Sequence, residues 1–146
     1  MNIGQLQAIW IKRMKRGPMD AANSASLVAG KGIVGNANQG GKRQVTIIEE
    51  EVWQSLMNSL GANIAPTARR ANLMVRGISL VKTSNQVLKI GNCRLRILGE
   101  TRPCERMDEA FLGLREAMKA NWGGGAFAEV LNDGEIKIGD LVIWEE

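Results

Sequence analysis

The 146-residue sequence has no histidine and no tyrosine, and it contains only two cysteines and three prolines. The absence of histidine excludes a Ser-His-Asp or Cys-His triad, an HExxH zinc site and imidazole acid-base catalysis by this chain. Any chemistry must therefore come from carboxylates, lysines, arginines or the two thiols. Two cysteines do not form a disulfide framework, so we expect a cytoplasmic setting with reduced thiols.

Long apolar runs are missing as well. The apolar run at residues 8–11 is short and precedes a basic cluster, which is the reverse of the order in a signal peptide. No stretch approaches the roughly 18 apolar residues of a membrane helix. We therefore expect a soluble protein with no membrane association. The length and the 45% hydrophobic fraction suit a single globular domain over residues 1–146.

Positive charge dominates most of the chain, although the formal net charge is only +4. Residues 1–104 contain fifteen lysines and arginines against five acidic residues, whereas residues 105–146 contain four against ten. A basic surface can attract nucleic acid, an anionic cofactor or an acidic protein, or it can simply be solvated. Charge alone does not choose among these partners.

The apolar pattern predicts many short strands and two clear helices. We expect strands at residues 5–11, 44–48, 73–75, 87–90, 93–98, 127–131 and 141–144, with a short extended piece between the last two. Helices are expected from Glu49 to Leu60, closed by Gly61, and from Glu109 to about Ala120, capped by Asp108. Residues 12–26 are expected to form a loop. This pattern favours a mainly β fold, a small β-barrel with two or three helices, over a βαβ sheet.

Five glycines occur within the twelve residues 30–41, and Gly30, Gly32 and Gly35 match the pattern GxGxxG. A dinucleotide site of that type needs a strand before the motif and a helix that opens on it. Here only three apolar residues precede the motif, and the residues that follow it are poor helix formers. We therefore expect these glycines to supply positive φ angles and close chain approach.

The two cysteines lie in different settings. Cys93 alternates with Leu95 and Ile97 in a predicted strand, so we expect it to pack as a small core residue. Cys104 lies in a predicted loop between Arg102 and Arg106, shortly before a predicted helix.

Neighbours of both signs surround Cys104. Cations and a helix N-terminus favour the thiolate, whereas Glu100 and Glu105 oppose it, so the residues alone leave its reactivity open. One thiol without histidine cannot form a structural zinc site.

Arginines are the second candidate feature. Arg43 follows the glycine-rich tract, Arg69 and Arg70 precede a predicted strand, and Arg76 follows it. Arginine binds phosphate or carboxylate with two parallel hydrogen bonds, and glycine-rich backbone can bring N–H groups to the same anion. The alternative is that these arginines pair with the acidic last third of the chain.

Stacking aromatics of the kind that bind single-stranded nucleic acid are scarce. Trp10, Trp53 and Trp144 lie in apolar segments and are expected in the core, which leaves Trp122 as the one candidate for an exposed platform. The sequence therefore does not favour nucleic acid as a partner.

Four segments, in this order, resemble the MOSC domain family, named for the C-terminal domain of molybdenum cofactor sulfurases. They are VAGKGIVGNANQGGKRQVTIIEEEVW, ARRANLMVRGISL, IGNCRLRILGETRPCERM and GGGAFAEVLNDGEIKIGDLVIW. The resemblance implies a predominantly β-barrel fold in a standalone domain of about the family's minimal size. The characteristic cysteine of the family falls on Cys104.

The resemblance also implies a function. In the family, the cysteine is proposed to accept sulfur as a persulfide from a pyridoxal-phosphate-dependent cysteine desulfurase and to deliver it to a metal centre. This chain would then be a sulfurtransferase-like carrier, whose partners are the desulfurase and a metalloenzyme acceptor. The expected site is a basic cleft around Cys104. Its further residues would be Arg43, Arg70, Asn72, Arg102, Gly40 and Gly41.

A second function implied by the resemblance is a binding module, or reductase component, for the molybdenum cofactor. Arginines would then hold the phosphate of molybdopterin, and the Cys104 thiolate would ligate molybdenum. A third possibility is an interaction domain that keeps the fold without chemistry. One departure bears on all three, because this chain has Asn36 and Asn38 where many members have an aspartate and often a histidine.

Overall fold

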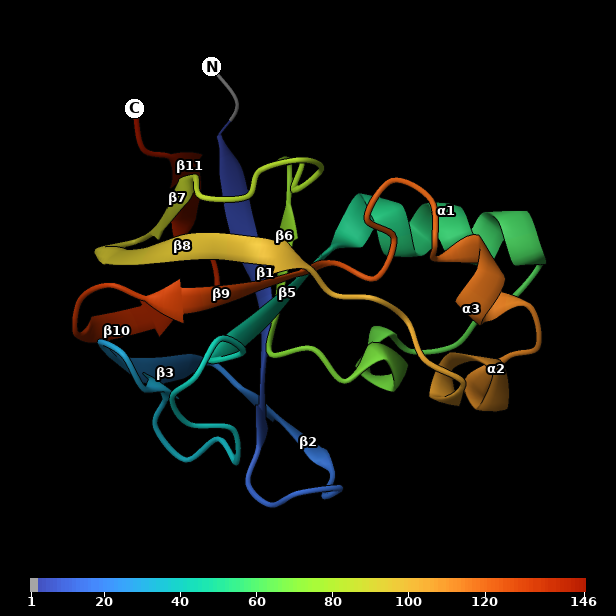
Figure 1. The fold of residues 1–146 in the computed structure, drawn as a ribbon, viewed down its shortest axis with the longest axis horizontal. Helices are drawn as coiled ribbons and strands as arrows, with labels where there is room; N and C mark the ends of the chain where they lie inside the picture. The colour runs from blue at the N-terminus through green and yellow to red at the C-terminus, as the bar shows by residue number, and fades with distance from the viewer. Residues whose placement is uncertain (1–2) are drawn as a thin grey trace.

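The computed structural model describes residues 3–146, a mainly β chain whose helices gather on one side of the strands (Figure 1). The strands are β1 (Gly4–Lys12), β2 (Met19–Ala22), β3 (Ser24–Val28), β4 (Gly32–Ile33), β5 (Val45–Glu49), β6 (Leu73–Arg76), β7 (Val87–Ile90), β8 (Cys93–Glu100), β9 (Ala126–Val130), β10 (Gly134–Lys137) and β11 (Leu141–Trp144). The helices are α1 (Glu50–Leu60), the 3₁₀ helix η1 (Pro66–Arg69), α2 (Arg106–Ala110) and α3 (Leu114–Ala117).

Seven strands close into a barrel in the order β11-β7-β8-β9-β5-β6-β1, because β1 also pairs with β11. Strand β2 pairs with the second half of β1, and β10, β3 and β4 form a separate small sheet. Strands β5 and β6 are parallel, and α1 with η1 supplies the crossover that a parallel pair requires. The predicted fold, a small β-barrel with two or three helices, is confirmed.

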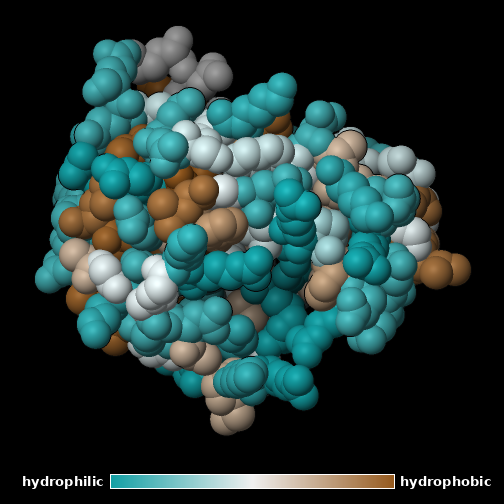
Figure 2. All heavy atoms as spheres, viewed as in Figure 1, coloured by the Kyte–Doolittle hydropathy of each residue, from teal (hydrophilic) through white to brown (hydrophobic). Residues whose placement is uncertain are grey.

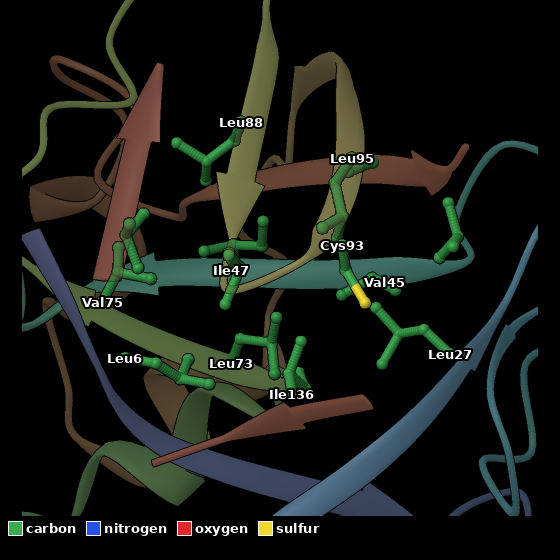
Figure 3. Close-up of a cluster of buried hydrophobic side chains, with 14 of the residues drawn as sticks. Leu6, Leu27, Val45, Ile47, Leu73, Val75, Leu88, Cys93, Leu95 and Ile136 are labelled. Carbon is green, nitrogen blue, oxygen red and sulfur yellow. The ribbon is translucent and has the colours of Figure 1, made fainter. Parts of the chain in front are cut away.

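Alternating residues of the barrel strands fill its interior with aliphatic side chains (Figure 3). Cys93 is one of them: its side chain points toward Leu27 and Val45, and the residue is 0% exposed. On the opposite face of β8, Arg94 and Arg96 pair with glutamates at the surface. The prediction that Cys93 packs as a core residue is therefore confirmed.

A second apolar cluster holds the helices together. Its buried members are Trp53, Leu56 and Met57 of α1, Met107 of α2, Leu114 of α3, and Met118. Helix α1 ends at Gly61 in the left-handed conformation, with φ 62°, as the sequence predicts. None of the helices in residues 3–146 has the length and hydrophobicity needed to cross a membrane.

The prediction of a loop over residues 12–26 is wrong, because β2 lies there and β3 begins there. Strand β2 has the sequence MDAA and none of its residues is fully buried, so it carries no apolar alternation. Its strand conformation comes from hydrogen bonding to β1, with Lys12 opposite Met19. Pairing with a neighbouring strand therefore determines the conformation of a segment whose local sequence does not predict a strand.

The predicted helix from Glu109 to about Ala120 is also corrected. Helices α2 and α3 are separate, and Gly113 between them has φ 94°. The Asp108 carboxylate caps the second helix, because its Oδ1 accepts hydrogen bonds from the backbone N–H groups of Gly113 at 3.2 Å and Arg115 at 3.0 Å. The prediction that Asp108 caps a helix beginning at Glu109 is therefore wrong, because Asp108 lies within α2 and its carboxylate binds the start of α3 instead.

Trp122 is not an exposed platform. Its side chain is half-buried and packs against the barrel core. The one aromatic residue that the sequence left as a stacking surface therefore belongs to the packing of the fold.

Candidate functional site

A cavity of about 190 Å³ lies where one end of the barrel meets η1 and α2. Its lining includes five cationic residues from separate stretches of the chain, which are Lys12, Arg43, Arg69, Arg70 and Arg106. Within residues 3–146, no aspartate or glutamate lines it. Hydrophilic residues spread over the middle of the face in Figure 2, whereas apolar residues gather over the barrel at the left. Walls of a single charge concentrate ions of opposite charge, so this cavity is suited to an anion.

Arg69 is held in the cavity wall by backbone oxygens. Its Nε donates to the Gly124 carbonyl at 2.9 Å, and its Nη2 donates to the Thr101 carbonyl at 3.4 Å. A Cβ at Gly124 would overlap the Thr101 carbonyl oxygen, so only glycine allows this approach. Burial lowers the pKa of Arg69; the nearby Cys104 raises this pKa, and Arg43 lowers it further.

Arg70 follows η1 in a left-handed conformation with φ 61°, which is uncommon for a residue with a Cβ. Its backbone N–H caps η1 by donating to the Thr67 carbonyl, and its Nη2 donates to the Gly17 carbonyl at 2.6 Å. The second bond fixes the turn between β1 and β2 against η1. The backbone turn at Arg70 therefore brings two distant segments together at the cavity.

Asn72 connects three strands through its side-chain amide. Its Oδ1 accepts from the Thr46 N–H at 3.1 Å and from the Thr46 hydroxyl at 3.3 Å. Its Nδ2 donates to the Trp10 carbonyl and to Oδ1 of Asn36, both at 3.1 Å. Both polar atoms of the amide are thus used within the protein, and Asn72 shapes the cavity wall rather than offering free donors to it.

Lys12 ends β1 at the cavity. Partial burial lowers its pKa, and the positive charges of Arg70, Arg106 and Lys15 lower it further. The ion pairs found in residues 3–146 include none of the five cavity cations. Without a bound anion, these cations therefore repel one another.

Thr101 lies beside the same cavity and has an unsatisfied polar atom behind the cavity wall. It follows β8, lines the cavity, and is only 7% exposed. Its Oγ1 is buried and has no hydrogen-bond partner within residues 3–146. Buried hydroxyl groups normally have a partner, so this atom is an exception among the described residues.

Cys104 lies on the cavity wall in the segment between β8 and α2, and it is exposed. Its carbonyl accepts the Met107 N–H at 3.0 Å, which fixes the segment against the start of α2. That helix has only five residues, so the cationic cavity rather than a long helix sets the environment of the thiol. The other thiol, Cys93, is buried, and burial raises its pKa with a further contribution from Asp140.

The sequence profile of MOSC domains matches residues 33–143, a span that includes both Arg43 and Cys104. The chain belongs to the MOSC domain family. This family is associated with functions related to the molybdenum cofactor, and the resemblance seen in the sequence is confirmed. No curated protein matches the sequence at a significant level.

Solved structures share the fold of this MOSC domain. The YuaD protein from Bacillus subtilis is 19% identical, with a TM-score of 0.80, and the match covers 96% of this chain and 94% of that chain. YiiM from Geobacillus stearothermophilus is 16% identical, with a TM-score of 0.77 and coverage of 98% and 75%. YiiM from Escherichia coli is 12% identical, with a TM-score of 0.74 and coverage of 97% and 70%.

The structure places four of the predicted site residues of this MOSC domain on the cavity wall. These are Cys104, Arg43, Arg70 and Asn72. The other three, Arg102, Gly40 and Gly41, do not line the cavity. Arg102 is exposed, and the two glycines form a turn with φ values of 71° and 66°. As expected, Gly40 and Gly41 serve backbone geometry. Residues 30–44 contain no helix that could complete a dinucleotide site.

Several cavity residues were outside the predicted site. Arg69 and Arg76 were both candidates for anion binding. Arg69 lines the cavity. Arg76 lies elsewhere and donates to Oε1 of Gln5 at 2.8 Å. Lys12 and Thr101 were missed. The switch from apolar to basic residues at Lys12 was a usable signal, but no local pattern distinguishes Thr101 from other loop threonines.

Proposed function

We propose that this MOSC domain is a cytoplasmic sulfur carrier. In this proposal, Cys104 accepts sulfur as a persulfide from a pyridoxal-phosphate-dependent cysteine desulfurase. It then delivers the sulfur to molybdenum or to another metal–sulfur centre in an acceptor metalloenzyme. The observation that supports the proposal is an exposed thiol on the wall of a cavity with five cations and no carboxylate within the described residues.

The chemistry needs only the thiol and its electrostatic surroundings. The Cys104 thiolate attacks the outer sulfur of the donor's persulfide, the donor S–S bond breaks, and its electron pair leaves with the donor cysteine as a thiolate. Cys104 then holds the transferred sulfur as an anionic perthiolate, which nearby cations stabilise. No histidine is required, and the pyridoxal phosphate belongs to the partner.

The proposed roles of the other residues follow from their places. Arg43 and Arg70 line the cavity and stabilise the anionic sulfur, whereas Asn72 holds the cavity wall in shape. Arg102 is exposed close to Cys104 in sequence and is suited to contact an acidic partner surface. Gly40 and Gly41 form the turn that leads to Arg43.

Mass spectrometry of the intact protein tests the proposal. After incubation with a cysteine desulfurase and cysteine, the wild-type chain should gain the mass of one sulfur atom, which a reductant should remove. Cys104→Ser should abolish this gain, and the matched control Cys93→Ser should retain it. A gain that persists in Cys104→Ser, or no gain at all, would contradict the proposal.

A second function is supported by the anion-binding character of the cavity. Five cations fit the phosphate group of a molybdopterin, and the Cys104 thiolate is a soft ligand suited to molybdenum. When bound, this cofactor supplies a redox-active metal. The residues Arg43, Arg69 and Arg106 would hold its phosphate, which would make the protein a cofactor-binding module or a reductase component.

The two functions differ in what the purified protein contains. A module that binds the cofactor should co-purify with pterin fluorescence, which Arg106→Gln should reduce. A sulfur carrier should show no such fluorescence but should gain sulfur from the desulfurase. An interaction domain would show neither signal, and its partner binding would be unchanged in Cys104→Ser.

A further inference from the structure

The cavity holds more positive charge and more space than a persulfide needs. A perthiolate carries one negative charge and has one sulfur atom more than the thiolate, whereas five cations line this cavity. The volume of about 190 Å³ is more than ten times the roughly 10–15 Å³ that a single water requires. The ligand that completes this site is therefore a multi-atom anion.

The electrostatics of the cavity favour an oxyanion with more than one negative charge. The pKa of Lys12 is lowered by burial and then by Arg70 and Arg106, and Arg43 lowers the pKa of Arg69. A bound dianion would reverse this mutual repulsion among the cations. Hydrogen bonds from arginine to an oxyanion are both stronger and more directional than bonds between neutral groups.

Arg69 provides a second indication of a ligand. It lines the cavity and uses only two of its N–H groups on the Gly124 and Thr101 carbonyls, so others remain for a ligand. The guanidinium N–H groups of the cavity arginines form a donor set for the oxygens of a tetrahedral anion.

The Cys104 thiol shares this cavity, and this determines the class of anion. We propose that the cavity binds a thiosulfate-class oxyanion, in which a transferable sulfur is bonded to a sulfonate group, and that Cys104 takes its sulfur. This inference rests on the proposed function, because it requires a persulfide on Cys104. It adds a small-molecule donor that loads the carrier without a partner protein.

The sulfur transfer balances without an additional reactant. The Cys104 thiolate attacks the outer sulfur of thiosulfate and forms a new S–S bond. The bond between the outer sulfur and the sulfonate sulfur breaks, and its electron pair leaves with sulfite. One thiolate and one dianion give one perthiolate and one dianion, so no proton, oxidant or reductant is needed. The cations offset the repulsion between thiolate and thiosulfate and stabilise sulfite as it leaves.

The experiment incubates the full chain with thiosulfate and measures both the intact mass and the sulfite released. We expect one sulfur gained for each sulfite released, no gain in Cys104→Ser, and competitive inhibition by sulfate, which has the anionic oxygens but no transferable sulfur. With cyanide as acceptor, turnover gives kcat and KM. The control Arg76→Gln removes a cation outside the cavity and should behave as wild type.

Arg106→Gln tests whether the cavity binds the anion. This change removes one cation from the cavity wall and keeps a polar side chain. Because a hydrogen bond to a charged group is worth about 1.5–3 kcal/mol, we expect kcat/KM for thiosulfate to fall by about tenfold or more, mainly through KM. Equal kinetics in Arg106→Gln and wild type, or no effect of sulfate, would overturn the inference.

Failure of the inference can be distinguished from failure of the proposed function. If the desulfurase loads Cys104 but thiosulfate does not, the inference is overturned and the carrier function stands. If neither donor loads Cys104 in a folded protein, both are overturned. If thiosulfate loads Cys104 no faster than it reacts with free glutathione, the cavity has no role and the inference is again overturned.

Discussion

The side-chain amide of Asn72 donates a hydrogen bond to Oδ1 of Asn36 over 3.1 Å. The same oxygen accepts the backbone N–H of Lys12 at 2.9 Å, so the glycine-rich tract, β1 and the start of β6 meet at one buried atom. The resemblance to MOSC domains led us to expect an aspartate at the position of Asn36. In this chain the amide contributes to the frame of the cavity without adding negative charge to it.

Asn72→Ala should destabilise the fold. The change leaves the Thr46 N–H and the Trp10 carbonyl without their side-chain partner, and each unsatisfied buried group costs about 1–3 kcal/mol. Urea unfolding should show a lower midpoint with little change in slope. The control Asn63→Ala replaces an exposed asparagine and should leave the midpoint nearly unchanged. Equal midpoints for both variants would contradict the assigned role of Asn72.

Asn36→Asp should preserve the frame but reduce anion binding. An aspartate oxygen can still accept from the Lys12 N–H and from Asn72, but its negative charge would compete with an anion for the cavity cations. Sulfate at fixed ionic strength should raise the melting temperature of the wild type more than that of the variant. An equal sulfate effect would show that the anion binds elsewhere.

Lys12→Gln should raise the free energy of unfolding in low-salt buffer without sulfate or phosphate. The pKa of Lys12 is lowered in the folded state by burial and by Arg70 and Arg106. The protonated, charged form of Lys12 therefore destabilises the folded state. The unfolded pKa is near 10.5, and the folded state loses the proton first. The advantage of the variant should therefore be full at pH 7 and should shrink as the pH rises toward 10.5. Salt should also reduce it.

Glu49 provides a pH test outside the cavity. Burial raises its pKa, the Leu80 N–H that donates to Oε2 at 3.1 Å lowers it, and Glu51 raises it. Because the folded pKa lies above 4.5, wild type loses stability relative to Glu49→Gln as the pH rises from 4.5 through the folded pKa. Glu49→Ala should be less stable than Glu49→Gln by about 1–3 kcal/mol at any pH, because the Leu80 N–H loses its acceptor. A difference between wild type and Glu49→Gln that is independent of pH would contradict this assignment.

The two thiols should differ sharply in accessibility. Iodoacetamide should modify Cys104 in the native protein, since this residue is exposed, and should reach Cys93 only after unfolding. Peptide mapping identifies the modified residue. Rapid native labelling of Cys93 would mean that the barrel opens more readily than its packing indicates. Cys93→Ser should cost about 1–3 kcal/mol, because it buries a hydroxyl among aliphatic side chains.

Sequence pattern was sufficient where a segment has its own apolar periodicity. The alternation of Cys93, Leu95 and Ile97 located β8 and its buried face, and the apolar face of α1 with Gly61 located the first helix. Pattern failed where a neighbour decides the structure. Strand β2 exists because β1 pairs with it, and the second predicted helix breaks at Gly113, where Asp108 caps a new start.

The sequence alone determined that chemistry in this chain cannot use histidine, and it directed attention to Cys104 and to arginines. Only the tertiary structure decided which cations share a cavity. Lys12, Arg43, Arg69 and Arg106 are far apart in the chain, and their meeting depends on barrel closure and on the packing of η1 and α2. It also decided that Arg102 lies outside the cavity. The physical reason is that composition and local pattern set the charge and the secondary-structure elements, whereas long-range packing sets which charged side chains line one cavity.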